Sequence, residues 1–199
     1  MWEQYGLFIV IGVALILTAA VSFETFRAWS NKRNQEVSNA YTVAVALQNQ
    51  GRYDESLDIL KNLAESNRGI YSDIAKLQIA NIYIEQGKTA EALEILAFLA
   101  NNNKSNRQMR DVAAIKLASY KLDSDAPAEE ITGLLEPLTD EDNSWSNVAH
   151  ELLAMLYIRE GNIEEARAEY EAVLNSSNVQ DALKARAQDM LTLLSEQSK

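Results

Sequence analysis

The residues best suited to catalysis or metal binding in this sequence gather around its single histidine, His150. His150 opens the stretch HELLA, which begins like a zinc-protease helix, but Ala154 stands where that motif needs its second histidine. A serine nucleophile would also need His150 as its base, and no serine lies in a G-x-S-x-G sequence. We therefore expect His150 to be a packed or half-exposed helical residue.

Carboxylate pairs are the second group of residues that could do chemistry. Glu129–Glu130 and Glu164–Glu165 both stand near the predicted start of a helix, where carboxylates favour the positive end of the helix dipole. The sequence contains no cysteine, which excludes disulfides, thiolate metal sites and a cysteine nucleophile. It contains no phosphate loop or dinucleotide fingerprint either. These features predict a protein that is not an enzyme and that binds no cofactor or metal.

Composition predicts the fold class and excludes one class of partner. The formal net charge is −11, which argues against nucleic acid, because phosphates must be met by clustered Lys and Arg. Two prolines and seven glycines among 199 residues, with abundant Ala, Leu and Glu, describe an all-α chain.

The elements that must position these residues repeat along the chain. Similar segments occur as NQGRYDESLDIL (49–60), EQGKTAEALEIL (85–96) and REGNIEEARAEY (159–170). Their glycines are separated by 36 and 74 residues, so a degenerate copy is expected near residue 125. The segment DAPAEEITGLLEPL (125–138) has the same layout, with Asp125 in place of the glycine. About four helix pairs, each too small to bury its own apolar face, predict a stacked array.

The spacing within each pair matches a tetratricopeptide repeat (TPR). Small residues at two positions let the paired helices approach closely, and the glycine permits the positive φ that ends the first helix. A generic helical bundle is the alternative. The matching small, aromatic or large, and glycine positions are Ala44, Leu47, Gly51, Ser56 and Leu60; Ala80, Tyr83, Gly87, Ala92 and Leu96; and Ala154, Tyr157, Gly161, Ala166 and Tyr170.

The predicted helix pairs occupy residues 36–66, 72–101, 108–138 and 147–175. A final helix over 179–195 carries Leu183, Ala187, Met190 and Leu194 on one face and is expected to cap the open end of the array.

An uncharged apolar run, LFIVIGVALILTAAVSF, extends from Leu7 to Phe23. With its flanking residues it has about the 17 to 25 residues that span a hydrocarbon core. We expect an anchor segment over residues 1–30 containing a transmembrane helix, followed by the repeat domain over 31–199. Aromatic residues flank the span where interfacial belts lie, namely Trp2, Tyr5, Phe26 and Trp29.

A signal peptide cleaved after Ala20 is the alternative, but no Lys or Arg precedes the apolar run and the run is long. The orientation of the span is left open by the residues alone. Arg27, Lys32 and Arg33 follow it, so the positive-inside rule would keep the repeats in the cytoplasm, yet large domains translocate largely regardless of charge.

Several segments carry a family resemblance that covers nearly the whole chain. They are Trp29, Ala40–Tyr41, GIYSDIAKLQIANIYIEQG (69–87), LLEPL (134–138) and NSWSNVAHELLAMLYIREGN (143–162). With them the chain resembles a bacterial TPR-like family of single-span inner-membrane proteins that are ancillary subunits of the Sec translocon. Members of that family carry a charged cytosolic stretch before the span, and MWEQYG looks like its end. The resemblance therefore implies a bacterial inner-membrane location with the repeats in the periplasm.

In a TPR array the first helix of each pair lines a concave face that binds protein segments. The expected face mixes apolar and polar residues without a repeated Lys/Asn pattern, so an extended segment or a partner helix suits it better than a terminal carboxylate. The alternative is that its apolar members pack between repeats. Counting back from the turns places on it Tyr41, Val45, Gln48, Leu77, Asn81, Ile84, Glu85, Glu151, Met155 and Arg159.

Two functions follow. The first is a membrane-anchored scaffold or co-chaperone beside the Sec translocon, as the resemblance implies, holding a periplasmic chaperone or an emerging substrate. The second is a structural accessory subunit of another inner-membrane complex, which uses the anchor and the outer surface of the array. The oligomeric state is not predicted.

Overall fold

The structure is a computed structural model that describes residues 34–66, 69–124 and 126–197 together with Glu24, Arg27 and Lys32. Every regular element in this described part is helical. The chain divides into two compact units, Met1–Ile59 and Leu60–Lys199, and the division falls inside helix α2 (Tyr53–Glu65). The predicted boundary after residue 30 lies among residues outside the described part, so it stays a prediction.

The described part of the first unit contains a helix that includes residues 34–49, a turn at 50–52 and the beginning of α2. Ala44 and Ser56 are fully buried, and the Ser56 hydroxyl donates a hydrogen bond to the Ala44 carbonyl over 2.8 Å. A serine is small enough to let the two helices approach, and this bond satisfies its buried hydroxyl. The close contact predicted for the first pair is therefore present.

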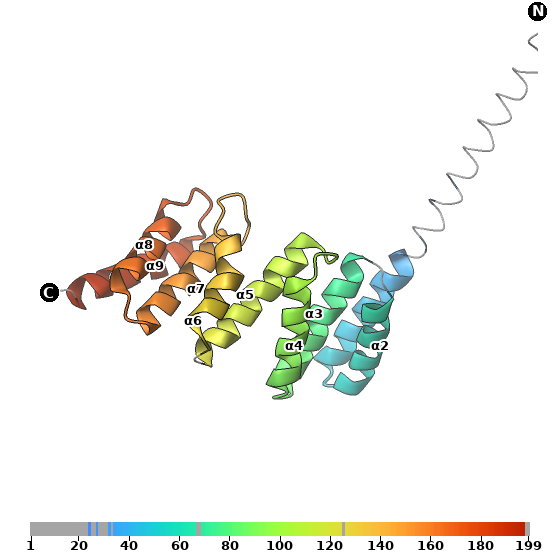
Figure 1. The fold of residues 1–199 in the computed structure, drawn as a ribbon. Helices are drawn as coiled ribbons and strands as arrows, with labels where there is room; N and C mark the ends of the chain where they lie inside the picture. The colour runs from blue at the N-terminus through green and yellow to red at the C-terminus, as the bar shows by residue number, and fades with distance from the viewer. Residues whose placement is uncertain are drawn as a thin grey trace, which may run out of the picture. The chain divides into compact units, whose positions relative to one another are not determined.

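The second unit is a sequence of helices in which each packs against the next in chain order (Figure 1). Helix α3 also contacts α5, and α5 contacts α7, so these three first helices form one layer. The predicted all-α repeat architecture is confirmed for the described residues. The elements are α3 (Ile70–Glu85), α4 (Thr89–Asn101), α5 (Arg107–Asp123), α6 (Ala128–Leu135), the 3-10 helix η1 (Glu136–Leu138), α7 (Ser146–Arg159), α8 (Ile163–Asn175) and α9 (Asp181–Gln197).

The core of this unit consists of clusters in which each second helix is buried between two first helices. Helix α4 places Leu96 and Leu99 between α3 and α5, and neither side chain is exposed. Helix α6 lies in the same way between α5 and α7, and α8 lies between α7 and α9. Helix α9 buries Leu183, Ala187 and Leu194 against α7 and α8. It thus covers the last second helix, as expected of a cap.

Glycine ends the first helix of a pair through its positive φ, as predicted. Gly87 has φ of 74°, its N–H donates to the Ile84 carbonyl over 2.9 Å, and the Lys88 N–H donates to the Tyr83 carbonyl over 2.8 Å. These two bonds satisfy carbonyls that the helix end would leave unpaired. Gly51 and Gly161 have the same conformation, with φ of 75° and 77°.

The third pair turns without a glycine. Asp125, which takes the glycine position in the sequence, lies outside the described residues, but the Ala126 N–H donates to the Lys121 carbonyl over 3.1 Å, as Lys88 does to Tyr83. The connection occupies residues 124–127, against 86–88 and 160–162 in the neighbouring pairs. Because it is one residue longer, Ile131 takes the buried place that Ala92 has in α4.

A glycine that ends a helix and a glycine inside a helix predict stability changes of opposite sign. Gly87→Ala forces a side chain into a left-handed conformation and should lower the unfolding free energy by about 1 to 2 kcal/mol. Gly133 lies inside α6, and a Cβ added there meets nothing within 4 Å. Gly133→Ala should therefore raise the unfolding free energy by about 0.5 to 1 kcal/mol. Urea unfolding of both variants measures the difference, and equal shifts would contradict the assigned turn.

Candidate functional site

The four predicted face residues of α3 differ in how accessible they are. Leu77 is buried and packs in the core with α4 and α5, and half-buried Ile84 packs against the same cluster. Asn81 is half-buried and donates to the Gln78 side chain over 3.4 Å, while Glu85 is exposed. For Leu77 the structure favours the alternative of packing between repeats. Asn81 and Glu85 both have side-chain surface that is accessible to solvent.

The predicted residues of α7 also divide between structure and surface. The carboxylate of Glu151 accepts hydrogen bonds from Nε and Nη2 of Arg186 on α9, at 2.8 and 2.9 Å. Hydrogen bonding to Glu151, together with its negative charge, raises the pKa of Arg186. Met155 is 43% exposed, so part of its apolar side chain lies on the surface of the helix layer. Glu151 thus ties the cap to α7, and Met155 offers an apolar contact.

Arg159 holds the turn of the preceding pair. Its Nη2 donates to the Ala126 carbonyl over 2.8 Å, and its Nη1 donates to the Leu122 carbonyl over 3.4 Å. The Leu122 carbonyl belongs to the end of α5 and the Ala126 carbonyl to the connection after it, where the glycine of the other pairs is missing. A guanidinium that caps carbonyls in this way stabilises the helix end. Arg159 therefore stabilises the preceding turn. The sequence predicted it only as a residue of the binding face.

The predicted residues of the first unit are Tyr41, Val45 and Gln48, and all three are half-buried. Burial raises the pKa of the Tyr41 hydroxyl. A half-buried tyrosine with one accessible edge is a common feature of protein interfaces. Their binding role stays a prediction.

Sequence reasoning omitted α5, whose corresponding residues are Ile115, Ser119 and Asp123. Ile115 is buried, Ser119 is half-buried and Asp123 is exposed. They precede Asp125 by the same numbers of residues by which Leu77, Asn81 and Glu85 precede Gly87. The signal was therefore present in the sequence, although this pair lacks the glycine.

A polar residue at one repeat position fastens α3 and α5 each to the loop before the next first helix. The buried carboxylate of Asp73 accepts from the Ser105 hydroxyl over 2.9 Å and from the Asn106 N–H over 2.8 Å. Asp111 accepts from the Asn143 side chain over 3.1 Å. Asn147 has the equivalent place in α7. These contacts, which span about one repeat, were not predicted from the sequence.

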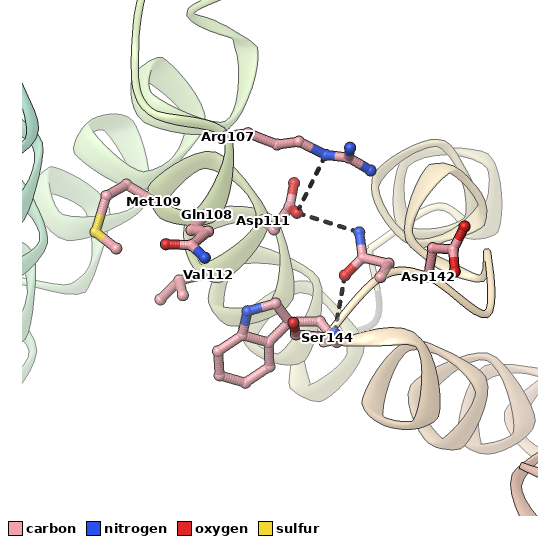
Figure 2. A pocket seen from close by; sticks show the side chains of 9 residues that line it. Arg107, Gln108, Met109, Asp111, Val112, Asp142 and Ser144 are labelled. Carbon is pink, nitrogen blue, oxygen red and sulfur yellow. Dashed lines mark hydrogen bonds and ion pairs between the residues drawn. The ribbon is translucent and has the colours of Figure 1, made fainter. Parts of the chain in front are cut away.

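A hollow of about 360 Å³ lies where the first turns of α5 face the loop before α7 (Figure 2). Asp111 and Asn143 form its polar side, and the Asn143 side-chain oxygen accepts from the Trp145 N–H over 2.8 Å. Met109, Val112 and Trp145 contribute apolar surface. In Figure 2 the Arg107 guanidinium lies beside Asp111, and the two are 4.0 Å apart. This hollow was not predicted either, because it depends on contacts between neighbouring pairs.

The residues considered for catalysis take structural positions. His150 is half-buried on α7, as predicted, and its Nδ1 lies 2.6 Å from a carboxylate oxygen of Glu169 on α8. Glu129, Glu130, Glu164 and Glu165 stand in the first turns of α6 and α8, as expected from the helix dipole. Within the described residues no three His, Cys, Asp or Glu side chains gather closely enough to hold a metal ion.

The predicted membrane features lie outside the part of the chain that the structure describes. These are the span from Leu7 to Phe23 and the interface residues Trp2, Tyr5, Phe26 and Trp29. Among the residues that are described, no helix combines the length and the apolar character needed to cross a bilayer.

Comparison with known protein families agrees with the repeat geometry. Residues 1–192 match the family of the tetratricopeptide repeat-like domain. No curated protein and no solved structure matches the chain. The paired helices, the glycine turns and the stacked clusters are the features that such repeats share. Since the match covers nearly all of its 199 residues, the chain belongs to the tetratricopeptide repeat-like domain family.

Proposed function

We propose that this chain is a membrane-anchored protein-binding scaffold or co-chaperone, which holds its partner on the first-helix face of α3, α5 and α7. The observation that carries the proposal is Met155, which stays 43% exposed in a layer whose other large apolar residues are mostly covered. A polarisable, flexible thioether adapts to apolar side chains of different shapes. Asn81, on the same layer, adds amide groups for an extended backbone or a helix.

The proposal includes the cellular location of the chain and the identity of its partner. The apolar run Leu7–Phe23 supports a single-span anchor in a bacterial inner membrane. The resemblance to ancillary subunits of the Sec translocon supports a location of the repeats in the periplasm, next to the translocon and its chaperones. An emerging polypeptide is an extended apolar segment, which fits a face of this composition.

The rival function is a structural accessory subunit of another inner-membrane complex, held by its anchor and its outer surface. One observation favours it. Phe98 on α4 is 56% exposed, with the Lys76 ammonium 6.0 Å from its ring centre, so the second helices also present an apolar contact. An exposed phenylalanine is a typical anchor of a protein interface.

Met155 and Phe98 allow a direct comparison of the two surfaces. The full chain is purified in mild detergent, and its partners are identified by mass spectrometry. If the first-helix face binds the partner, Asn81→Ala with Met155→Asp should reduce co-purification roughly 30-fold, because a central interface residue contributes about 2 kcal/mol. Phe98→Asp should leave co-purification unchanged.

A chain whose Leu7–Phe23 run is exchanged for an unrelated apolar helix serves as the second control. Circular dichroism and thermal melting verify that every variant keeps its helices. Loss of the partner only with Phe98→Asp, or only on exchange of the apolar run, would reject the first-helix face and support the accessory subunit.

Orientation is tested separately by labelling a single cysteine. The native chain has no cysteine, and Ser177 is exposed in the loop between α8 and α9. In intact spheroplasts Ser177→Cys should react with a membrane-impermeant thiol reagent, because periplasmic repeats face the medium. Labelling that occurs only after lysis would place the repeats in the cytoplasm, as the positive-inside rule alone predicts.

A further inference from the structure

Positive charge is concentrated in one segment of this acidic chain. Residues 95–122 contain five of the 18 Lys and Arg residues and one of the 29 Asp and Glu residues, although the whole chain has a net charge of −11. The basic side chains are Lys104, Arg107, Arg110, Lys116 and Lys121. The segment runs from the end of α4 through α5. A local charge of opposite sign attracts an anionic ligand to this place and disfavours it elsewhere on the chain.

A hollow of about 310 Å³ opens beside this segment, between α4, α5 and the end of α6. Arg107 and Arg110 both line it. Its remaining surface combines small or apolar residues with three polar ones, Asn101, Asp111 and Asn143. The small or apolar residues include Ala100, Ala114, Gly133, Leu134 and Pro137.

Both arginines have N–H donors without a hydrogen-bond acceptor among the described residues. Arg110 donates from Nη1 to the Asn103 side chain over 2.9 Å, but its Nε is buried without a hydrogen-bond partner among the described residues. A buried charged donor without an acceptor is costly, so such groups are normally paired. Arg107 is 69% exposed at its side chain, and its one polar contact among the described residues is a 4.0 Å ion pair with Asp111. Asp111 in turn already accepts from Asn143.

We propose that this hollow, the Arg107–Arg110 hollow, binds carboxylate side chains of an acidic segment in a partner protein. Two guanidinium groups match carboxylates in bidentate geometry, and the buried Nε of Arg110 has no acceptor among the described residues. Leu134, Pro137 and Ala100 offer apolar contact to the methylene groups that carry those carboxylates. Inorganic phosphate would gain nothing from that apolar surface. The inference rests on the proposed protein-binding function in taking a protein segment as the occupant, but it uses a different surface.

The test uses the full chain in detergent and a short fluorescent oligoglutamate peptide, with oligoglutamine of equal length as the neutral probe. Fluorescence anisotropy measures binding. Arg107→Gln with Arg110→Gln should weaken oligoglutamate binding by about ten-fold or more, since hydrogen bonds to charged groups are the stronger ones. Lys61→Gln with Lys184→Gln removes the same charge at exposed positions of α2 and α9. This control should change binding less than two-fold, because salt screens the attraction between distant charges.

A steric variant tests the hollow without changing charge. Gly133→Leu places a side chain where a Cβ meets no atom within 4 Å, and it should fill part of the hollow and weaken oligoglutamate binding. Circular dichroism shows whether each variant remains folded. Asn81→Ala with Met155→Asp should keep full oligoglutamate binding. Loss of partner binding at the first-helix face and loss of oligoglutamate binding in the hollow can therefore be told apart.

Three outcomes would overturn the inference. The first is equal affinity of the wild-type chain and the double arginine variant for oligoglutamate. The second is an equal loss in the Lys61/Lys184 control, which would mean unspecific attraction. The third is binding of vesicles rich in anionic lipid, or of inorganic phosphate, through the same arginines without binding of oligoglutamate, which would assign the hollow to a headgroup or a free phosphate.

Discussion

Each second helix of this array depends on the first helix that follows it. Leu96 and Leu99 of α4 are fully buried only because α3 covers one side and α5 covers the other. A single helix pair exposes one of these sides, and burial of a leucine contributes roughly 1.5 to 3 kcal/mol. The same arrangement repeats at α6, between α5 and α7, and at α8, between α7 and α9. Each helix pair is therefore stabilised by its contacts with the neighbouring pairs.

This constraint also decides which surfaces are free to bind. Since the first helices contact the second helices of two pairs and also contact each other, most of their apolar residues are covered, as Leu77 is. Met155 is an exception, and it is the exposed residue from which we propose that the first-helix layer binds a partner. Where α4 and α6 flank α5, the gap between neighbouring pairs leaves a hollow with Arg107 and Arg110 at its edge. Both surfaces arise from the way pairs stack, not from any one helix.

The sequence was sufficient for features that depend on one pair alone. Gly51, Gly87 and Gly161 predicted the turns, because they recur at the same repeat position and glycine readily adopts the positive φ that ends a helix. The features missed depend on two pairs. Arg159 reaches carbonyls at Leu122 and Ala126, and Asp73 reaches the loop at Ser105 and Asn106. The Arg159 contact occurs once and has no periodicity to reveal it. Asp73 and Asp111 do share a repeat position, but the sequence alone does not distinguish a buried carboxylate from an exposed one.

The most direct measurement is hydrogen exchange along the full chain carrying Leu183→Asp in α9. Leu183 is 7% exposed in the cluster that covers α8, so a charge there should detach the cap. If each second helix depends on the next first helix, the amides of α8 should lose protection while those of α4, which is covered by α3 and α5, keep theirs. Unchanged protection of α8 with α9 detached would contradict this account of how the array is held together.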